Sequence, residues 1–119
     1  MSSKKLKHKN VGDSKVGEHE VDLPSNTLHM NICEYKEGSK SEHHRHAYEA
    51  ILYIVEGEGH TMISGEKIEW KAGDAVYISP WEWHQHFALK NSKVVSCTNE
   101  NLFKNISPKK IIEIKEKAS

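Results

Sequence analysis

The chain has 119 residues, 17 Lys and Arg against 17 Asp and Glu, and a formal net charge of +0 at pH 7. This length fits one domain, and the balanced charge excludes the global basic excess typical of nucleic-acid-binding proteins. The longest apolar run, residues 50–55, is too short to span a bilayer, and no apolar segment follows the N-terminal lysines as a secretory signal requires. Cys33 and Cys97 form no CxxC pair and are interpreted as reduced. We therefore expect a cytoplasmic protein without nucleic-acid or membrane partners.

The predicted elements begin after a polar, charged segment over residues 1–20, which lacks periodicity and is predicted to be a mobile arm. Residues 21–115 form the expected domain, and residues 116–119 form a tail. Alternating or continuous apolar residues predict strands, and a helical turn is expected at residues 102–104. The predicted strands cover residues 28–32, 44–46, 50–55, 60–63, 67–70, 75–78, 84–89, 94–98 and 111–114.

The turn residues between these strands predict how some of them pair. Ser64-Gly65 predicts a hairpin between residues 60–63 and 67–70, and Asn91-Ser92 predicts a second one between 84–89 and 94–98. Residues 50–55 are continuously apolar, which predicts a strand buried on both faces. Short strands at intervals of about ten residues indicate an all-β sandwich or barrel.

Two His-x-His pairs carry the strongest chemical signal. His44 and His46 are two residues apart, and so are His84 and His86. Residues two apart on a strand share one face, so each strand aims two imidazoles at one point. Neutral imidazole is the commonest transition-metal ligand near pH 7, and two such strands facing each other predict a histidine metal pocket.

The spacing around these histidines resembles the two cupin motifs. Gly38-x5-His44-x-His46 followed by Gly57 is similar to the first motif, G-x5-H-x-H-x3,4-E-x6-G. Gly73-x5-Ser79 followed by Trp81-x2-His84 is similar to the second, G-x5-P-x-G-x2-H-x3-N. The resemblance covers about residues 27–98. It implies a double-stranded β-helix, a small jelly-roll barrel that is often a homodimer, with a divalent metal held by His44, His46 and His84.

The chain departs from the motifs at several positions. The family glutamate falls at Ala50, and Glu49, one residue earlier, has the opposite strand parity. We expect Glu49 not to bind the metal, although it is the candidate for a fourth ligand. The second-motif glycine is replaced by Trp81. Gentisate-type dioxygenases, which are longer two-cupin chains, resemble this chain at the site. They have the His-Arg-His stretch without the ligand glutamate, and a Pro-x-Trp-x-Trp-His-x-His stretch that is similar to residues 79–86.

Three further residues are expected to serve the site. His86 shares the strand parity of His84. It is therefore a candidate for a fourth ligand, an acid-base group or a wall residue of the pocket. We favour the acid-base role, which makes His86 the candidate catalytic residue. Trp81 and Trp83 either stack on a planar substrate in the pocket or cap the barrel and pack in a dimer interface.

We expect a metal-dependent, dioxygenase-like oxidoreductase that acts on a small anionic molecule, with aromatic acids among the candidates. Three neutral histidines without a carboxylate leave positive charge on the metal, which favours an anionic ligand. Fe(II) is the favoured metal, and the ligand set also fits Mn, Ni, Co or Zn. The alternatives are a non-catalytic cupin that binds a metal or small molecule, and a metal-dependent isomerase or lyase.

Overall fold

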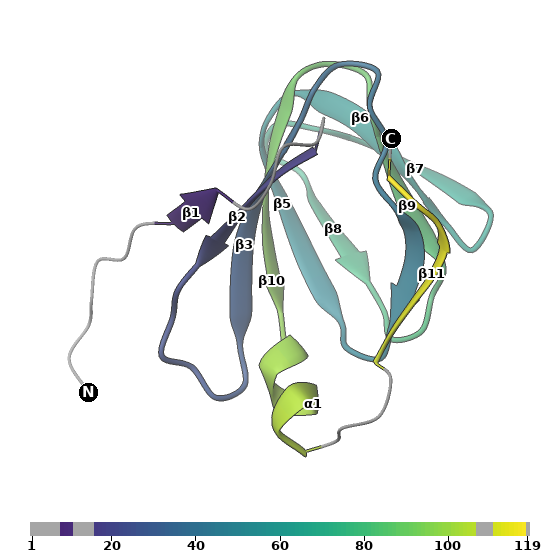
Figure 1. The fold of residues 1–119 in the computed structure, drawn as a ribbon. Coiled ribbons are helices and arrows are strands. Elements are labelled where there is room, and N and C mark those ends of the chain that lie inside the picture. The colour runs from purple at the N-terminus through teal and green to yellow at the C-terminus, as the bar shows by residue number, and fades with distance from the viewer. Residues whose placement is uncertain (1–7, 11–15, 107–110, 119) are drawn as a thin grey trace.

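Two antiparallel sheets face each other across the interior of the protein (Figure 1). The computed structural model describes residues 8–10, 16–106 and 111–118. The first sheet has the strand order β1-β2-β3-β10-β5-β8. Its strands are β1 (His8–Asn10), β2 (Val16–Val21), β3 (His29–Tyr35), β5 (Ala50–Glu56), β8 (Ala75–Ile78) and β10 (Ser92–Thr98).

The second sheet has the order β11-β4-β9-β6-β7 and carries the histidine motifs. Helix α1 (Glu100–Ile106) follows β10, and the Thr98 hydroxyl accepts a hydrogen bond from the Glu100 amide at its first residue. No helix in the described ranges is long and apolar enough to cross a membrane. The strands of the second sheet are β4 (His43–His46), β6 (Glu58–Ile63), β7 (Glu66–Lys71), β9 (His84–Ala88) and β11 (Ile112–Glu116).

The apolar core lies between the sheets. Ile54 and Ile78 are 1% and 0% exposed, and Trp70 of the second sheet packs into the same cluster. Burying a side chain of this size contributes about 1.5–3 kcal/mol. The core therefore holds the two sheets together and leaves the space beside it for polar groups. The cluster consists of Tyr35, Ala50, Leu52, Ile54, Trp70, Val76, Ile78, Ala88 and Val94.

Two glycines at the turn between β5 and β6 allow neighbouring backbone and side chains to approach closely. Gly57 has a φ of 96°, and a Cβ there would collide with Ser92 and the Asn91 carbonyl. A Cβ on Gly59 would collide with the Phe87 carbonyl and the Trp70 ring. The Gly-x-Gly sequence is thus required by the backbone conformation at Gly57 and by packing space at Gly59.

Most strands lie where the sequence predicts them, and the 64–65 hairpin forms between β6 and β7. The 84–89/94–98 hairpin is wrong, because β9 pairs with β4 and β6 whereas β10 pairs with β3 and β5. The chain turns near Asn91, but it crosses from one sheet to the other instead of folding back. Strand β5 is also not buried on both faces, since Ile51 and Tyr53 are 54% and 49% exposed.

The N-terminal prediction is wrong for β2. Residues 16–21 pair with β3 along the strand, although they were expected to belong to the mobile arm. Their polar character is explained by the environment, because Glu18 and Glu20 face a polar cavity instead of the apolar core. Such a strand has no apolar alternation to reveal it. Residues 1–7 and 11–15 of the predicted arm lie outside the described residues.

Candidate metal centre

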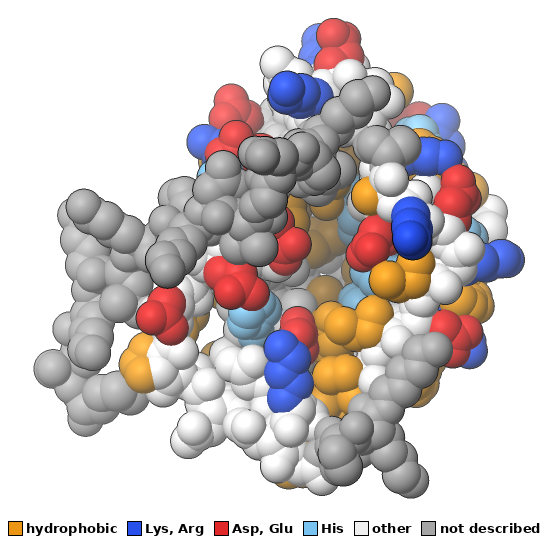
Figure 2. All heavy atoms as spheres, viewed as in Figure 1, with side chains coloured by type: hydrophobic (Ala, Val, Ile, Leu, Met, Phe, Trp, Pro, Cys, Tyr) orange, Lys and Arg blue, Asp and Glu red, His pale blue; other side chains and the backbone are white. Residues whose placement is uncertain are grey.

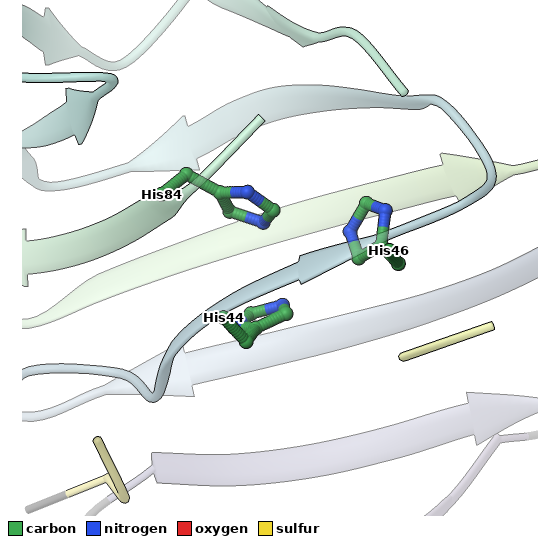
Figure 3. A group of neighbouring side chains, drawn as sticks. All are labelled: His44, His46 and His84. Atoms are coloured by element: carbon green, nitrogen blue, oxygen red, sulfur yellow. The ribbon is translucent and has the colours of Figure 1, made fainter. Parts of the chain in front are cut away.

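Three histidines from two neighbouring strands meet inside the barrel (Figure 3). His44 and His46 come from β4, and His84 comes from β9, where it is the direct cross-strand partner of His44. One ligating nitrogen from each ring lies within 4.8 Å of the others. The sequence-predicted ligands are therefore brought together by strand parity on β4 and by the β4–β9 pairing.

A backbone carbonyl fixes the orientation of each of these rings. The Nδ1 atoms of His44, His46 and His84 lie 3.1, 2.7 and 2.8 Å from the carbonyl oxygens of Glu42, Tyr48 and Glu82, respectively. Carbonyl oxygens accept hydrogen bonds, so Nδ1 is the protonated nitrogen in each neutral ring. The lone pair is then on Nε2. The same anchoring through the second ring nitrogen is typical of metal-binding histidines.

Burial keeps the imidazoles of His46 and His84 uncharged. His46 and His84 are 5% and 2% exposed. Burial, together with the neighbouring His44 and His86 rings, lowers the pKa of His84 to about 2, and burial also lowers the pKa of His46. At neutral pH both rings therefore present lone pairs and no charge, which is the state that binds a metal.

The donor set of the centre is three nitrogens without a carboxylate. The Glu49 side chain is exposed, and its carboxylate accepts a hydrogen bond of 3.2 Å from the Tyr77 hydroxyl on the outer side of the barrel. Opposite strand parity thus directs Glu49 away from the cluster. Three converging imidazoles fit a divalent first-row metal with open coordination positions.

His86 lies in the cavity beside the cluster and is anchored by a buried relay. The Trp70 Nε1–H donates to Thr61 Oγ1 at 3.0 Å, and Thr61 Oγ1 lies 2.8 Å from His86 Nδ1. Thr61 is 0% exposed, so its hydroxyl proton goes to His86 Nδ1, the acceptor beside it. His86 then carries its proton on Nε2. Burial lowers the pKa of His86 to about 3, so the ring is a neutral hydrogen-bond donor.

Trp81 and Trp83 are not among the described residues that line the cavity. The Arg45 guanidinium lies over both indoles, with its Cζ 5.1 and 4.7 Å from the Trp81 and Trp83 ring centroids. Arg45 lies between His44 and His46 in sequence and therefore faces the outer side of the sheet. These observations do not support stacking of the two tryptophans on a substrate in the pocket. The other role, capping the barrel or packing in a dimer interface, stays a prediction.

Backbone conformation contributes to the outward position of Trp81. This residue has a φ of 60°, at the position where the cupin motif has glycine, and its amide donates a 2.7 Å hydrogen bond to the His46 carbonyl. A left-handed backbone is unfavourable for a residue with a Cβ. The cation–π contact with Arg45 offsets part of that cost.

The histidines line a cavity of about 320 Å³ between the two sheets. Across from them, β2 and β3 contribute Glu18, Glu20 and Asn31. The sequence reasoning missed these residues; the signal was the same-face spacing of Glu18 and Glu20. Tyr48 was also missed as a cavity residue, and its ring stacks on His46 with centroids 4.0 Å apart. Leu52, Ile78 and Val94 connect the cavity to the apolar core.

Residues 31–97 match the family model of the cupin domain, and the chain belongs to this family. Over 50 residues it is 38% identical to gentisate 1,2 dioxygenase 1 of Aquipseudomonas alcaligenes, a match that covers 41% of this chain and 14% of that protein. It is 24% identical over 85 residues to 5-aminosalicylate 1,2-dioxygenase of Comamonas sp, covering 71% of this chain and 22% of the relative.

Solved structures show the same fold. The salicylate 1,2-dioxygenase from Pseudoaminobacter salicylatoxidans, in an adduct with gentisate, superposes with a TM-score of 0.82 at 13% identity. The superposition covers 90% of this chain and 31% of that one. The chain thus spans less than a third of this dioxygenase and less than a quarter of the two curated relatives.

Proposed function

We propose that this cupin is a metal-dependent, dioxygenase-like oxidoreductase, with Fe(II) as the favoured metal. The observation that carries the proposal is the three-imidazole cluster at the cavity, whose rings are anchored through Nδ1 and in which one nitrogen of each ring lies within 4.8 Å of the others. A ligand set of three neutral nitrogens leaves metal positions open to substrate and dioxygen. The relatives, named as dioxygenases of gentisate and 5-aminosalicylate, support the same reaction class.

The bound metal would supply Lewis acidity and electron transfer with dioxygen. The protein residues supply the rest of the site. His86 holds a proton at Nε2 that is available to a molecule bound in the cavity, because Thr61 occupies its Nδ1. Tyr48 and Tyr35 offer aromatic surfaces to a planar molecule, in place of the tryptophans that face outward. Ile78, Leu52 and Val94 exclude water from one end of the cavity. In a ring-cleaving dioxygenase reaction both oxygen atoms of O2 enter the organic product and the four electrons come from the substrate, so no external reductant is consumed.

The test is metal analysis combined with oxygen uptake. Protein purified without oxygen and loaded with Fe(II) should consume O2 with at least one member of a panel of catechols, gentisate and aminophenols. His84→Ala should abolish both the iron and the uptake. His43→Ala is the matched control, since His43 contacts Trp83 on the outer side of β4, with ring centroids 5.5 Å apart. Stoichiometric metal with no O2 uptake across the panel would instead favour the binding, isomerase or lyase alternatives.

We also infer that two copies of the chain associate through the outer face of the first sheet. Ile51 and Tyr77 are cross-strand neighbours, are each 54% exposed, and continue the apolar row of Cys97 on β10. An exposed apolar row of this kind is typical of an interface between proteins. Sedimentation should give a dimer for the native chain and a monomer for Ile51→Asp. A native monomer at high micromolar concentration would contradict the inference.

A further inference from the structure

The cavity lining has a strongly one-sided charge. Four glutamates line it, whereas the described lining residues include no lysine or arginine. Figure 2 shows acidic side chains around a hollow in which histidine side chains are visible. The four glutamates come from β2, from the segment before β4 and from the first residue of α1, so they surround the opening from several directions. They are Glu18, Glu20, Glu42 and Glu100.

These carboxylates differ in whether a cation already neutralises them. Glu100 forms an ion pair with Lys104 at 2.7 Å. Glu18 accepts a hydrogen bond of 2.6 Å from the neutral Asn31 amide. In the described part of the chain, neither Glu18, Glu20 nor Glu42 has a lysine or arginine within ion-pair distance. Three negative charges at the cavity therefore have no cationic partner there.

The cations nearest in sequence to the metal centre are directed elsewhere. Arg45 stacks on Trp81 and Trp83 outside the barrel, and it pairs with Glu113 at 3.4 Å. Lys40 pairs with Glu116 at 2.8 Å. A substrate carboxylate is ordinarily held by a bidentate arginine or a lysine. The described cavity residues include neither. An anionic substrate would therefore find positive charge only at the metal centre.

The carboxylates also act on the wall formed by β3. Tyr35 lies at the end of β3 and lines the same cavity as Glu18 and Glu42. Burial is the largest cause that raises the pKa of the Tyr35 hydroxyl, Cys33 raises it next, and the charges of Glu18 and Glu42 raise it further. A molecule bound in this cavity would therefore experience the charge of these two carboxylates.

We propose that the cavity selects a small molecule with a cationic nitrogen, such as a primary ammonium group, directed toward Glu18, Glu20 and Glu42, and with an oxygen donor directed toward the histidines. The oxygen end rests on the proposed function, because it requires the metal. The nitrogen end does not, since it depends on the protein carboxylates alone. An oxygen anion at the metal and an ammonium at the glutamates are compatible in one amphoteric molecule.

The test uses three probes that share a catechol ring and a two-carbon side chain. Dopamine ends in an ammonium group, 3-(3,4-dihydroxyphenyl)propionate ends in a carboxylate, and 4-ethylcatechol is uncharged. Binding is measured by calorimetry without oxygen, on the full chain both metal-free and loaded with redox-inert Zn(II). We expect dopamine to bind at least tenfold more tightly than the propionate and several-fold more tightly than 4-ethylcatechol in both forms. The preference should weaken as salt is raised.

The variants assign the preference to the carboxylates. Glu18→Gln/Glu42→Gln should reduce the preference for dopamine to less than threefold, and each single variant should reduce it in part. Glu66→Gln, at an exposed position in the β6–β7 hairpin, should leave it unchanged. Circular dichroism and zinc stoichiometry establish that the double variant remains folded and metal-competent.

Three outcomes would overturn the proposal: equal or tighter binding of the propionate, a dopamine preference that survives the double variant, or no binding of any probe to protein that holds one zinc per chain. Loss of zinc binding by the native protein would instead contradict the metal centre. The charge preference of the metal-free protein would still be measured in that case, so the two failures are distinguishable.

Discussion

The two walls of the cavity differ in how their residues are positioned. On the β4–β9 wall, His44, His46 and His84 point to one place because of strand parity and direct pairing, and each ring is tied to a carbonyl within two residues. On the opposite wall, Glu18 and Glu20 reach the cavity only because β2 pairs with β3. The first wall is thus organised by local sequence and the second by tertiary pairing. We therefore expect the histidine wall to determine the affinity for the metal, and the glutamate wall to determine which charge is preferred on a bound molecule.

The largest expected effect is on the histidine wall. His44→Ala removes one of three ligands and should weaken Zn(II) or Fe(II) binding at least 100-fold, or about 2.7 kcal/mol. His43→Ala, the adjacent outward-facing histidine, should change the affinity less than threefold, and Glu18→Gln on the opposite wall should remain within about fivefold. Competition with a chromophoric chelator measures all four proteins. An affinity loss in Glu18→Gln as large as in His44→Ala would remove the distinction between the walls.

Acid should destabilise the metal-free protein through the same wall. The pKa of His84 is lowered to about 2 and that of His86 to about 3, mainly by burial, whereas an unfolded histidine titrates near 6.5. Because the unfolded chain binds these protons first, the stabilisation is present above about pH 6.5 and is lost as the pH falls.

Between pH 7.5 and 5.5 each of the two rings should lower the free energy of unfolding by about 1.4 kcal/mol, which gives about 2.7 kcal/mol together, as measured by urea denaturation. His86→Gln should reduce the slope. A free energy of unfolding that is constant over this range would contradict the buried, neutral state of the two rings.

A smaller effect is expected from the buried hydrogen bonds that join Trp70, Thr61 and His86. Thr61→Val leaves the Trp70 Nε1–H without its acceptor and His86 Nδ1 without its donor, so it should cost about 1–3 kcal/mol in stability. If Thr61 had only a structural role, the loss of stability would be the only effect of this substitution. We also expect 15N NMR of the His86 ring to show one Nε2–H tautomer in the native protein and a mixture in Thr61→Val. Thr61→Ser is the matched control and should retain the single tautomer; a native Nδ1–H ring would contradict the relay.

The smallest expected effect is on the acidic wall. Glu18 is exposed, and glutamine retains an oxygen that can accept the Asn31 hydrogen bond. Glu18→Gln should therefore change the free energy of unfolding by less than about 0.5 kcal/mol while changing the charge of the cavity. Chemical denaturation at neutral pH measures this. A loss above about 1.5 kcal/mol would mean that Glu18 is structural.

The histidine wall was predictable from sequence because a period of two residues defines a strand face without knowledge of the fold. His44 and His46 required only that rule, and the same rule favoured a Glu49 that does not bind the metal. The pairing of β9 and β10 was not predictable in this way. Asn91-Ser92 indicates a turn, but the turn residues do not show whether the next strand returns to the same sheet or crosses to the other.

The remaining errors have a common origin in residues whose partners are distant in sequence. A pocket role was one of the two expected for Trp81 and Trp83 because they flank His84, but stacking on Arg45 of another strand holds them outside. Glu18 and Glu20 were assigned to an arm because a strand that lines a polar cavity lacks an apolar face. In both cases the tertiary neighbour determined the environment, and local composition did not reveal it.

The most direct test of the metal centre is metal identity and stoichiometry, by mass spectrometry, on untagged protein purified without oxygen. The account predicts about one iron per chain in the native protein and in His43→Ala, and less than a tenth of that in His84→Ala. Absence of metal from the native chain even after anaerobic reconstitution, or an equal metal content in His84→Ala, would contradict a metal site built from His44, His46 and His84.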